Sequence, residues 1–210
     1  IDTNASLEQR VHKRTKELQQ VNQQLKDELV RRKQAEERLA HLANTDELTG
    51  IDNRRAFFSK GEKLIANDCK VRCFFLLIDL DHFKAINDTH GHAVGDVVLE
   101  SVGKHIQGGV RTSGARPSSR ASDIVGRLGG EEFGVLLVSD DLDTAVLVAE
   151  RLRETLAETV IEAGSDTITV TGSFGMTEHL DGESLDELYQ RADKACYSAK
   201  DAGRNCLVIE

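Results

Sequence analysis

Residues 129–133 read Gly-Gly-Glu-Glu-Phe and lie between two apolar runs, 124–128 and 133–138, that are expected to be β-strands. A pair of glycines permits positive φ and a tight hairpin, so Glu131 and Glu132 place two negative charges at the tip of that hairpin. Such charges cost free energy unless water or a cation compensates them. The segment is therefore either a solvated surface hairpin or half of a metal site.

A second pair of carboxylates follows a run of six apolar residues, 73–78. Such a run indicates a strand buried on both faces, and Asp79 and Asp81 stand two residues apart at its exit, on the same side. Asp79 beside Glu131 would supply the hard oxygen ligands that suit Mg²⁺ or Mn²⁺. Asp81 is equally well explained as a cap of the following helix, whereas burial of Asp79 next to Glu131 requires a cation.

The overall composition argues against several classes of function. The 210 residues carry a formal net charge of -9, which disfavours binding of duplex DNA or RNA through a basic face, although a nucleotide bridged by a metal ion stays compatible. No apolar run reaches the roughly 20 residues needed to span a bilayer, and no signal peptide is visible. The four cysteines, without zinc-type spacing, indicate reduced thiols in a cytoplasmic protein. The first residue is Ile, so we expect a fragment of something longer.

Residues 1–44 differ from the rest of the chain because they contain no Gly, Pro, Phe, Trp or Tyr. Apolar residues there occupy a and d positions of one heptad frame, which predicts a coiled coil, most simply a parallel dimer; an amphipathic helix packed on its own domain is the alternative. A second frame starts at Leu29, and such a stutter is either a switch between two registers or a static imperfection. The apolar a and d residues are Leu7, Val11, Leu18, Val21, Leu25, Ala35, Leu39 and Leu42.

Residues 45–210 alternate between helical and strand patterns, which indicates an α/β sheet with helices packed on it. A turn is expected near residues 44–50, a polar segment over 82–96 and a Gly- and Ser-rich loop over 108–119. Helices are predicted over 55–66, 97–106, 141–159 and 183–202, and strands over 73–78, 124–128, 133–138, 167–175 and 206–209.

Several motifs in one order resemble those of the GGDEF-domain diguanylate cyclases, and the resemblance covers residues 45–210. It implies a palm-like nucleotide-cyclase fold with a central, mostly antiparallel sheet flanked by helices, preceded by the coiled-coil helix 1–44. The sequence departs from the family pattern at 51–52, where Ile-Asp replaces the usual Leu-Pro. The motifs are Asp46-Glu-Leu-Thr49, Asn53-Arg-Arg55, Asp79-Leu-Asp-His-Phe-Lys84, Asn87-Asp88, Gly91-His92, Gly95-Asp96, Gly129-Gly-Glu-Glu-Phe133 and the segment 193–205.

The resemblance implies condensation of two GTP molecules into cyclic di-GMP with release of two pyrophosphates. Asp79, the carbonyl of Leu80 and Glu131 would hold divalent metal, two Mg²⁺ or Mn²⁺ per half-site, with Glu132 as a ligand or a supporting carboxylate. Two metals stabilise the attacking and the leaving oxygen of an in-line displacement. Glu131 would also be the base for the 3′-hydroxyl, and Lys84 would stabilise charge in the transition state.

The resemblance also implies a GTP site. Asp96 would accept from N1 and N2 of guanine and Asn87 would reach the neighbouring edge, with His92 nearby; the alternative for both segments is turn chemistry. Backbone amides over 82–84, from His82, Phe83 and Lys84, would bind phosphate at a helix start. Lys200 and Arg204 would reach the terminal phosphates, although a lysine at a helix C-terminus is favoured anyway.

Regulation and assembly are the last features that the resemblance implies. Arg120 and Asp123 lie where the family's inhibitory product site carries Arg-x-x-Asp, with Arg151 as its secondary arginine; taken alone, the first two are an ordinary surface ion pair. Each domain would hold one GTP, so a homodimer must form, and a sensor domain upstream would control it. Two alternatives are a silent module that binds GTP or cyclic di-GMP, and a dimerisation scaffold with a vestigial domain.

Overall fold

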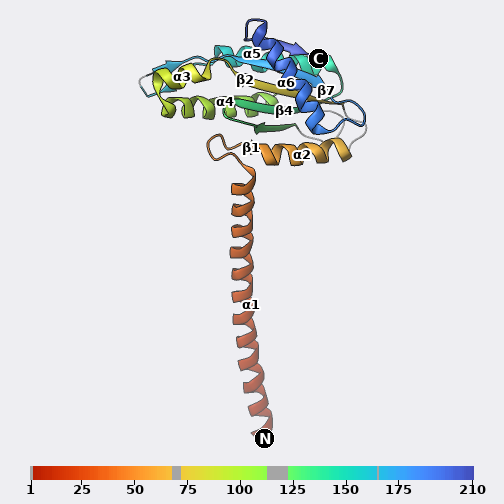
Figure 1. The fold of residues 1–210 in the computed structure, drawn as a ribbon. Helices are drawn as coiled ribbons and strands as arrows, with labels where there is room; N and C mark the ends of the chain where they lie inside the picture. Colours follow the sequence, from red (N-terminus) through yellow and green to blue (C-terminus); the bar gives the residue numbers. More distant parts are fainter. Residues whose placement is uncertain (1, 68–71, 113–122, 165) are drawn as a thin grey trace. The chain divides into compact units, whose positions relative to one another are not determined.

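The computed structural model describes residues 2–67, 72–112, 123–164 and 166–210 (Figure 1). The chain divides into two compact units, residues 1–43 and 44–210. The elements in chain order are α1 (Asp2–Asn44), β1 (Asp52–Asn53), α2 (Arg54–Asn67), β2 (Arg72–Leu80), α3 (Phe83–His90), α4 (His92–Thr112), β3 (Ile124–Arg127), β4 (Glu132–Ser139), α5 (Leu142–Glu158), β5 (Ile161–Ala163), β6 (Asp166–Ile168), β7 (Gly172–Glu178), α6 (Leu185–Asp201) and β8 (Leu207–Ile209).

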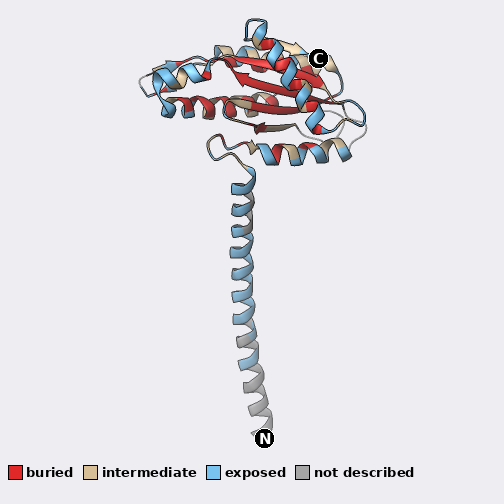
Figure 2. Cartoon of the chain, viewed as in Figure 1, coloured by how far each residue is buried: buried red, intermediate tan, exposed pale blue. Residues whose placement is uncertain are grey.

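The first unit is the single helix α1, whose sequence contains no helix breaker. Its described apolar side chains are exposed (Figure 2): Leu18 is 63% exposed, Leu25 57% and Leu39 66%. A helix that presents such residues on its surface has an apolar stripe that a partner helix can bury. Among the described helices, none has an apolar stretch of the length needed to cross a membrane.

In the described residues of the second unit, a six-stranded sheet has the order β1-β3-β4-β2-β7-β8. β2 lies between β4 and β7 and is antiparallel to both. β3 is also antiparallel to β4, whereas β1 and β8 add parallel pairs at the two edges. The predicted α/β fold with a central, mostly antiparallel sheet is confirmed.

The central strand β2 is covered on both faces because its side chains alternate between two apolar clusters. Phe74 and Leu76 belong to the cluster that includes residues of α4 and α5. Phe75 and Leu77 belong to the cluster that includes residues of α2 and α6. Since side chains two apart lie on one face of a strand, Asp79 shares the face of Leu77, toward α6.

Two segments differ from the prediction. Residues 82–96, expected as a polar segment, form α3 and the first turns of α4, since α3 has one buried side chain, Phe83, and packs against α4. The single strand expected over 167–175 is two strands, β6 and β7, because β6 pairs with β5 in a separate hairpin. The loop expected over 108–119 is helical as far as Thr112, and its remainder lies outside the described residues.

Candidate active site

Three carboxylates lie near one another where β2 ends and β4 begins. Asp79 on β2 lies directly opposite Glu132 on β4 in the antiparallel register. The N–H of Leu80 donates to the carbonyl of Glu131 at 3.2 Å, so the pairing continues into the Gly-Gly turn. Asp79 is buried and the two glutamates are half-buried. Asp79 and the two glutamates, which are far apart in the sequence, are therefore neighbours at one end of the sheet.

The cluster carries an excess of negative charge. Burial raises the pKa of Glu131 and of Glu132 above the ordinary value, and the charge of Asp79 raises both further. Lys200 on α6 supplies a positive charge, with its Nζ 2.8 Å from Oδ2 of Asp79. Burial lowers the pKa of Lys200, but the hydrogen bond and the charge of Asp79 outweigh burial and leave this pKa raised.

This charge balance fits a divalent cation, because one ammonium group does not neutralise three carboxylates. Within the described ranges, no three His, Cys, Asp or Glu side chains converge closely enough to hold a metal ion. A cation here would therefore need further oxygen atoms, such as the Leu80 carbonyl and the oxygens of a ligand. That donor set suits Mg²⁺, which is commonly bound by one or two carboxylates together with substrate phosphates.

Gly129 is suited to its position by the space that it leaves, and not by a positive φ. The expected hairpin joins β3 and β4, but neither Gly129 nor Gly130 is among the glycines with positive φ. A Cβ atom at Gly129 would lie 2.6 Å from Oε2 of Glu132, well inside van der Waals contact. The missing side chain at position 129 thus leaves space for the Glu132 carboxylate within the cluster.

Arg127 holds the Gly-Gly turn in place, and the sequence analysis did not single it out. Its guanidinium donates to the carbonyl of Gly129 at 3.2 Å and to that of Gly130 at 2.7 Å. Nη1 also donates to the carboxylate of Asp46 at 3.2 Å, which in turn accepts from the N–H and hydroxyl of Thr49. Arg127 therefore ties the hairpin that carries Glu131 and Glu132 to the turn that begins the second unit.

We expect Arg127→Met to lower the free energy of unfolding by about 2 kcal/mol near neutral pH, because Asp46 and two carbonyls lose a charged donor. Although burial raises the pKa of Asp46, hydrogen bonds from Thr49 and Arg127 hold it below the ordinary value. A lowered carboxyl pKa stabilises the folded state above the unfolded pKa, and this contribution is lost as the pH falls through the folded value. Urea unfolding of both proteins at roughly pH 7 and pH 3 should show the difference shrink in acid.

The control is Arg72→Met, which removes the arginine of a surface ion pair with Glu178 and should cost less. Equal losses for the two variants at neutral pH, or a loss for Arg127→Met that persists unchanged in acid, would contradict the bridging role.

Apart from Lys200 and Arg204, the residues predicted to bind the nucleotide lie on α3 and α4 or directly before α3. His82 precedes α3 in a left-handed conformation, φ 56°. Ala85 is the first residue of this helix whose N–H finds a carbonyl, that of His82 at 2.8 Å. The N–H groups of Phe83 and Lys84 precede the first helical bond and can face an anion. Lys84 itself is exposed.

The predicted guanine ligands share the α3–α4 pair. His92 and Asp96 lie in the first turns of α4 and are exposed, and Asn87 on α3 is half-buried. A Cβ at Gly95 would lie 1.9 Å from Oδ1 of Asn87. The absence of a side chain at position 95 therefore lets the Asn87 amide lie against α4, next to Asp96.

Arg204 stands in a strained turn between α6 and β8. Arg204 and Asn205 have φ of 66° and 43°, a left-handed conformation that costs about 1–2 kcal/mol for a residue such as arginine and less for asparagine. The N–H of Asn205 donates to Asp81 at 3.1 Å. Asp81 thus binds this turn and the hydroxyls of Thr171 and Ser173, and it does not cap α3, whose N-cap is His82. The capping interpretation is wrong.

The predicted inhibitory site is only partly within the described residues, because Arg120 lies outside them. Oδ1 of Asp123 accepts from the N–H of Val138 at 2.8 Å, and burial raises the pKa of its carboxyl. Arg151 donates through Nη2 to the carbonyl of Gly109 at 2.8 Å. Both side chains therefore already have partners inside the domain.

Comparison with known proteins places these features in context. Residues 43–206 match the family described as "Diguanylate cyclase, GGDEF domain". Diguanylate cyclase DgcM of Escherichia coli K12 is 40% identical over 184 residues, which cover 85% of this chain and 41% of that protein. Diguanylate cyclase A of Treponema denticola is 38% identical, with 81% of this chain and 45% of that protein covered. The chain thus spans less than half the length of these curated relatives.

Solved structures of GGDEF-containing proteins also resemble this chain. The coiled coil and GGDEF domain of DgcB from Caulobacter crescentus, in complex with c-di-GMP, superposes with a TM-score of 0.77 at 28% identity, covering 87% of this chain and 94% of that one. Diguanylate cyclase SiaD of Pseudomonas aeruginosa, in complex with its activator SiaC, has a TM-score of 0.72 at 31% identity and covers 100% of this chain and 78% of its own.

Proposed function

The chain belongs to the GGDEF family, and on that premise we propose that it condenses two GTP molecules into cyclic di-GMP and two pyrophosphates. The observation that carries the proposal is the carboxylate cluster of Asp79, Glu131 and Glu132, with Lys200 as its cation. Its excess negative charge suits metal-bound triphosphate and has no use in a hairpin that merely faces solvent.

We propose that Asp79, the Leu80 carbonyl and Glu131 hold divalent metal, two Mg²⁺ or Mn²⁺ ions per half-site, with Glu132 beside them. When bound, such ions neutralise phosphate charge and lower the pKa of the attacking 3′-hydroxyl. Glu131 accepts the proton of that hydroxyl, a role favoured by the raised pKa that burial and Asp79 produce. Lys200 leaves Asp79 and turns to the phosphates when GTP arrives.

The remaining phosphate contacts come from three sources in this proposal. The N–H groups at the start of α3, from His82 to Lys84, face the phosphates. The side chain of Lys84 adds a positive charge that stabilises the transition state. Arg204 reaches the terminal phosphate from the turn after α6, because a guanidinium binds phosphate through two parallel hydrogen bonds.

Guanine is recognised between α3 and α4 in this proposal. The Asp96 carboxylate accepts from N1–H and the N2 amino group, and the Asn87 amide binds the neighbouring edge, with His92 beside them. Adenine lacks that pair of donors, so ATP leaves Asp96 without hydrogen bonds and is rejected.

We expect Gly95→Ala to raise the KM for GTP about 10-fold, since the new methyl group displaces the Asn87 amide and removes a hydrogen bond to the base. Stability should change by less than about 1 kcal/mol, because the better helix propensity of alanine opposes the close contact of the added Cβ with the buried ring of Phe83 at 3.3 Å. Steady-state kinetics and thermal unfolding measure the two effects. Gly108→Ala in the same helix is the control, because no atom lies within 4 Å of its added Cβ; a KM change common to both variants would refute the displacement.

Assembly and regulation follow from the half-site. Each domain holds one GTP, so we propose that α1 forms a parallel coiled coil that brings two domains face to face, under the control of a sensor domain upstream. We also propose feedback inhibition through Arg120, Asp123 and Arg151. The DgcB neighbour, which has a coiled coil and was solved with c-di-GMP, supports both ideas. To bind product, the Asp123 carboxylate would have to release the N–H of Val138 and accept hydrogen bonds from guanine.

Incubation of the dimer with GTP and Mg²⁺, followed by chromatographic separation of nucleotides, tests the proposed reaction. We expect cyclic di-GMP and pyrophosphate from GTP and no cyclic dinucleotide from ATP. An Arg120→Ala variant belongs in the same assay, because product that co-purifies in the inhibitory site would mask activity. No product from a verified dimer of that variant would exclude the enzyme and favour a silent binding module.

A further inference from the structure

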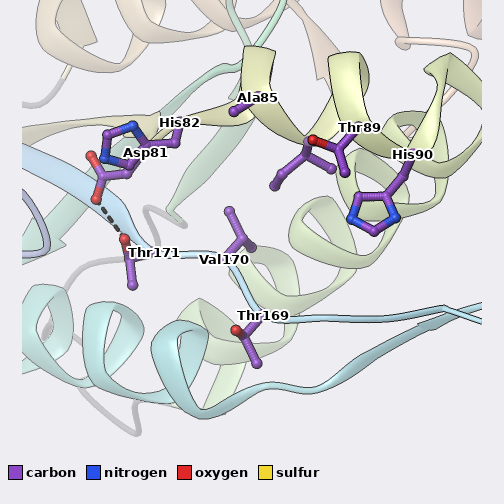
Figure 3. A pocket seen from close by; sticks show the side chains of 9 residues that line it. Asp81, His82, Ala85, Thr89, His90, Thr169, Val170 and Thr171 are labelled. Carbon is purple, nitrogen blue, oxygen red and sulfur yellow. Dashed lines mark hydrogen bonds between the residues drawn. The ribbon is translucent and has the colours of Figure 1, made fainter.

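The buried carboxylate of Asp81 lies where three segments of the domain meet, at one end of a 330 Å³ cavity beside α3 (Figure 3). Asp81 is 5% exposed, and both of its oxygens accept hydrogen bonds. Oδ1 accepts from the hydroxyl of Ser173 at 2.7 Å, and Oδ2 accepts from the hydroxyl of Thr171 at 2.7 Å and the N–H of Asn205 at 3.1 Å. A buried charge with this many donors anchors the segments that supply them.

One of these donors belongs to the turn that carries Arg204. Asn205 is held from both sides, because its N–H donates to Asp81 while its carbonyl and side-chain oxygens accept from Nη1 of Arg153 at 3.3 and 3.2 Å. The N–H of Arg204 donates to the carbonyl of Ala199 at 3.0 Å. These bonds fix the backbone at Arg204 and Asn205, and with it the direction of the Cα–Cβ bond of Arg204.

The turn needs this support because its conformation is unfavourable. Arg204 and Asn205 are consecutive residues in the left-handed region, which asparagine tolerates but an arginine avoids unless surrounding contacts impose it. Loss of the hydrogen bond from Asn205 to Asp81 would let the turn relax. The guanidinium of Arg204 would then no longer be held toward one place.

We propose that Asp81 is a positioning residue of the triphosphate site. By binding the backbone N–H of Asn205, Asp81 holds the neighbouring Arg204 in position to contact the phosphates. The inference rests on the proposed function, since that assigns Arg204 to the phosphates. Asp81 also orders the other side of the site: its own N–H donates to the carbonyl of Thr171 at 2.9 Å, and the next residue is His82, whose left-handed conformation starts α3.

Asp81→Asn is the sharpest test because it keeps the shape of the side chain and changes one acceptor atom into a donor. If the amide nitrogen faces the partners of Oδ2, the N–H of Asn205 loses its acceptor; if it faces the Ser173 hydroxyl, which can accept from it, the N–H of Asn205 donates to a neutral amide oxygen, a weaker bond than one to a carboxylate. We expect the KM for GTP to rise about 10-fold, with kcat at saturating GTP changed by less than about 3-fold, because Arg204 is loosened and not removed. Steady-state kinetics and the affinity for a non-hydrolysable GTP analogue measure the effect.

A double-mutant cycle with Arg204→Ala separates positioning from general destabilisation. If Asp81 acts through Arg204, adding Asp81→Asn to Arg204→Ala should raise the KM no further than Arg204→Ala does alone. Multiplied effects in the double variant would overturn the inference. Arg153→Met removes the second support of Asn205. It should also raise the KM for GTP, and only when Arg204 is present. This variant replaces Asp81→Asn in the test if Asp81→Asn does not fold.

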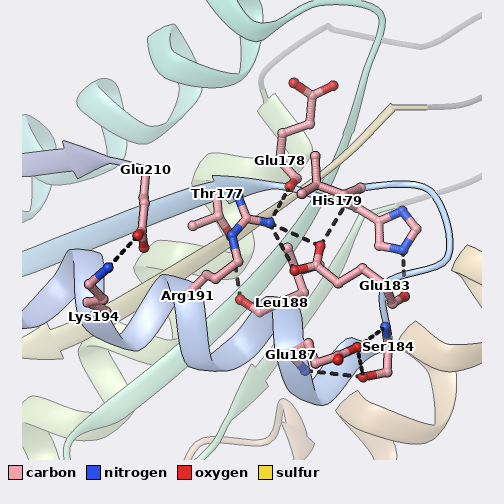
Figure 4. Close-up of polar contacts among 11 residues, drawn as sticks. Thr177, Glu178, His179, Glu183, Ser184, Glu187, Leu188, Arg191, Lys194 and Glu210 are labelled. Carbon is pink, nitrogen blue, oxygen red and sulfur yellow. Dashed lines mark hydrogen bonds and ion pairs between the residues drawn. The ribbon is translucent and has the colours of Figure 1, made fainter.

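Glu183→Gln is the matched control, because it changes another shielded carboxylate at the opposite end of α6 (Figure 4). The side chain of Glu183 is 9% exposed and pairs with Arg191 at 2.9 Å, and it accepts from the N–H of Leu180 at 3.0 Å. We expect a lower melting temperature with an unchanged KM for GTP. A similar KM increase in this control would show that loss of any buried carboxylate has the effect, which would refute positioning.

The design separates failure of the inference from failure of the proposed function. If the native chain forms no cyclic di-GMP, the proposed reaction is wrong, whereas the affinity of the native and Asp81→Asn proteins for the GTP analogue still reports on Arg204. Equal affinity of these two proteins for the analogue would overturn the positioning role even if the reaction proceeds.

Discussion

Glu131→Gln should reduce the formation of cyclic di-GMP by about 10³-fold, the largest effect that we expect from a single side chain. The proposed roles of Glu131 as a metal ligand and as the base for the 3′-hydroxyl are both lost when its carboxylate becomes an amide, and general base catalysis alone contributes about 10²–10⁴-fold. The measurement is the initial rate at saturating GTP and Mg²⁺. Residual activity above about a tenth of the native rate would rule out both roles.

The same variant should be at least as stable as the native protein. Burial, then the charges of Asp79 and Glu132, raise the pKa of Glu131, so its ionised form is unfavourable in the folded domain. The stability that such a group contributes is present below the unfolded pKa and is lost as the pH rises through the folded value. The increase in the free energy of unfolding caused by Glu131→Gln should thus appear at neutral pH and vanish in acid. Glu162→Gln, an exposed carboxylate on β5, should change neither rate nor stability.

This dissociation of activity from stability is expected of a functional cluster. Packing alone would place apolar or paired groups at the end of a buried strand, yet the domain keeps Asp79, Glu131 and Glu132 together with one lysine. In the proposed function, the free energy lost to this repulsion would be recovered when a cation and a phosphate bind. A structural hairpin would show the opposite behaviour, with loss of stability and no link to catalysis.

The central strands could be predicted because their signals are local. β2 and β4 are continuous apolar runs with carboxylates at their ends, so the neighbouring positions of Asp79 and Glu132 followed once the strands were paired. α3 was missed because its sequence is polar and its one buried residue, Phe83, gives no helical period. It is helical because it packs on α4, and such tertiary contacts override local pattern.

The roles of individual polar residues could not be predicted where their partners are distant in sequence. Asp81 lies beside the start of a helix and looks like a cap, but its donors are Thr171, Ser173 and Asn205, between 90 and 124 residues away. Arg127 likewise contacts Asp46, 81 residues before it. Neither hydroxyl groups nor a single arginine produce a periodic signal that would identify such contacts.

Deletion of residues 1–43 should leave a folded domain that makes cyclic di-GMP slowly and only in proportion to how often two copies meet. The second unit, residues 44–210, is compact by itself, so folding should survive. In the proposed reaction the product joins two GTP molecules across two half-sites, and a tether would hold such sites at an effective concentration in the millimolar range. At micromolar protein we therefore expect a loss of about 10²-fold or more.

The dependence of rate on concentration distinguishes this mechanism from damage to the site. Rate per mole should rise with protein concentration in the truncated domain and stay constant in the native chain, with molecular mass checked by light scattering. The stripe that includes Leu18, Leu25 and Leu39, exposed on the isolated helix, supplies the burial that favours pairing, about 1.5–3 kcal/mol per leucine fully buried. Leu25→Glu in the full chain should thus act like the deletion.

Replacement of residues 1–43 by an unrelated parallel two-stranded coiled coil, joined in the same heptad frame, is the matched control. It should restore the native rate, since the proposed half-site requires only a second copy at the right orientation. A truncated monomer whose rate per mole is high and independent of concentration would overturn the half-site mechanism. Restoration in one joining frame and not in another would show that the stalk also fixes the rotation of the two Gly-Gly turns toward each other.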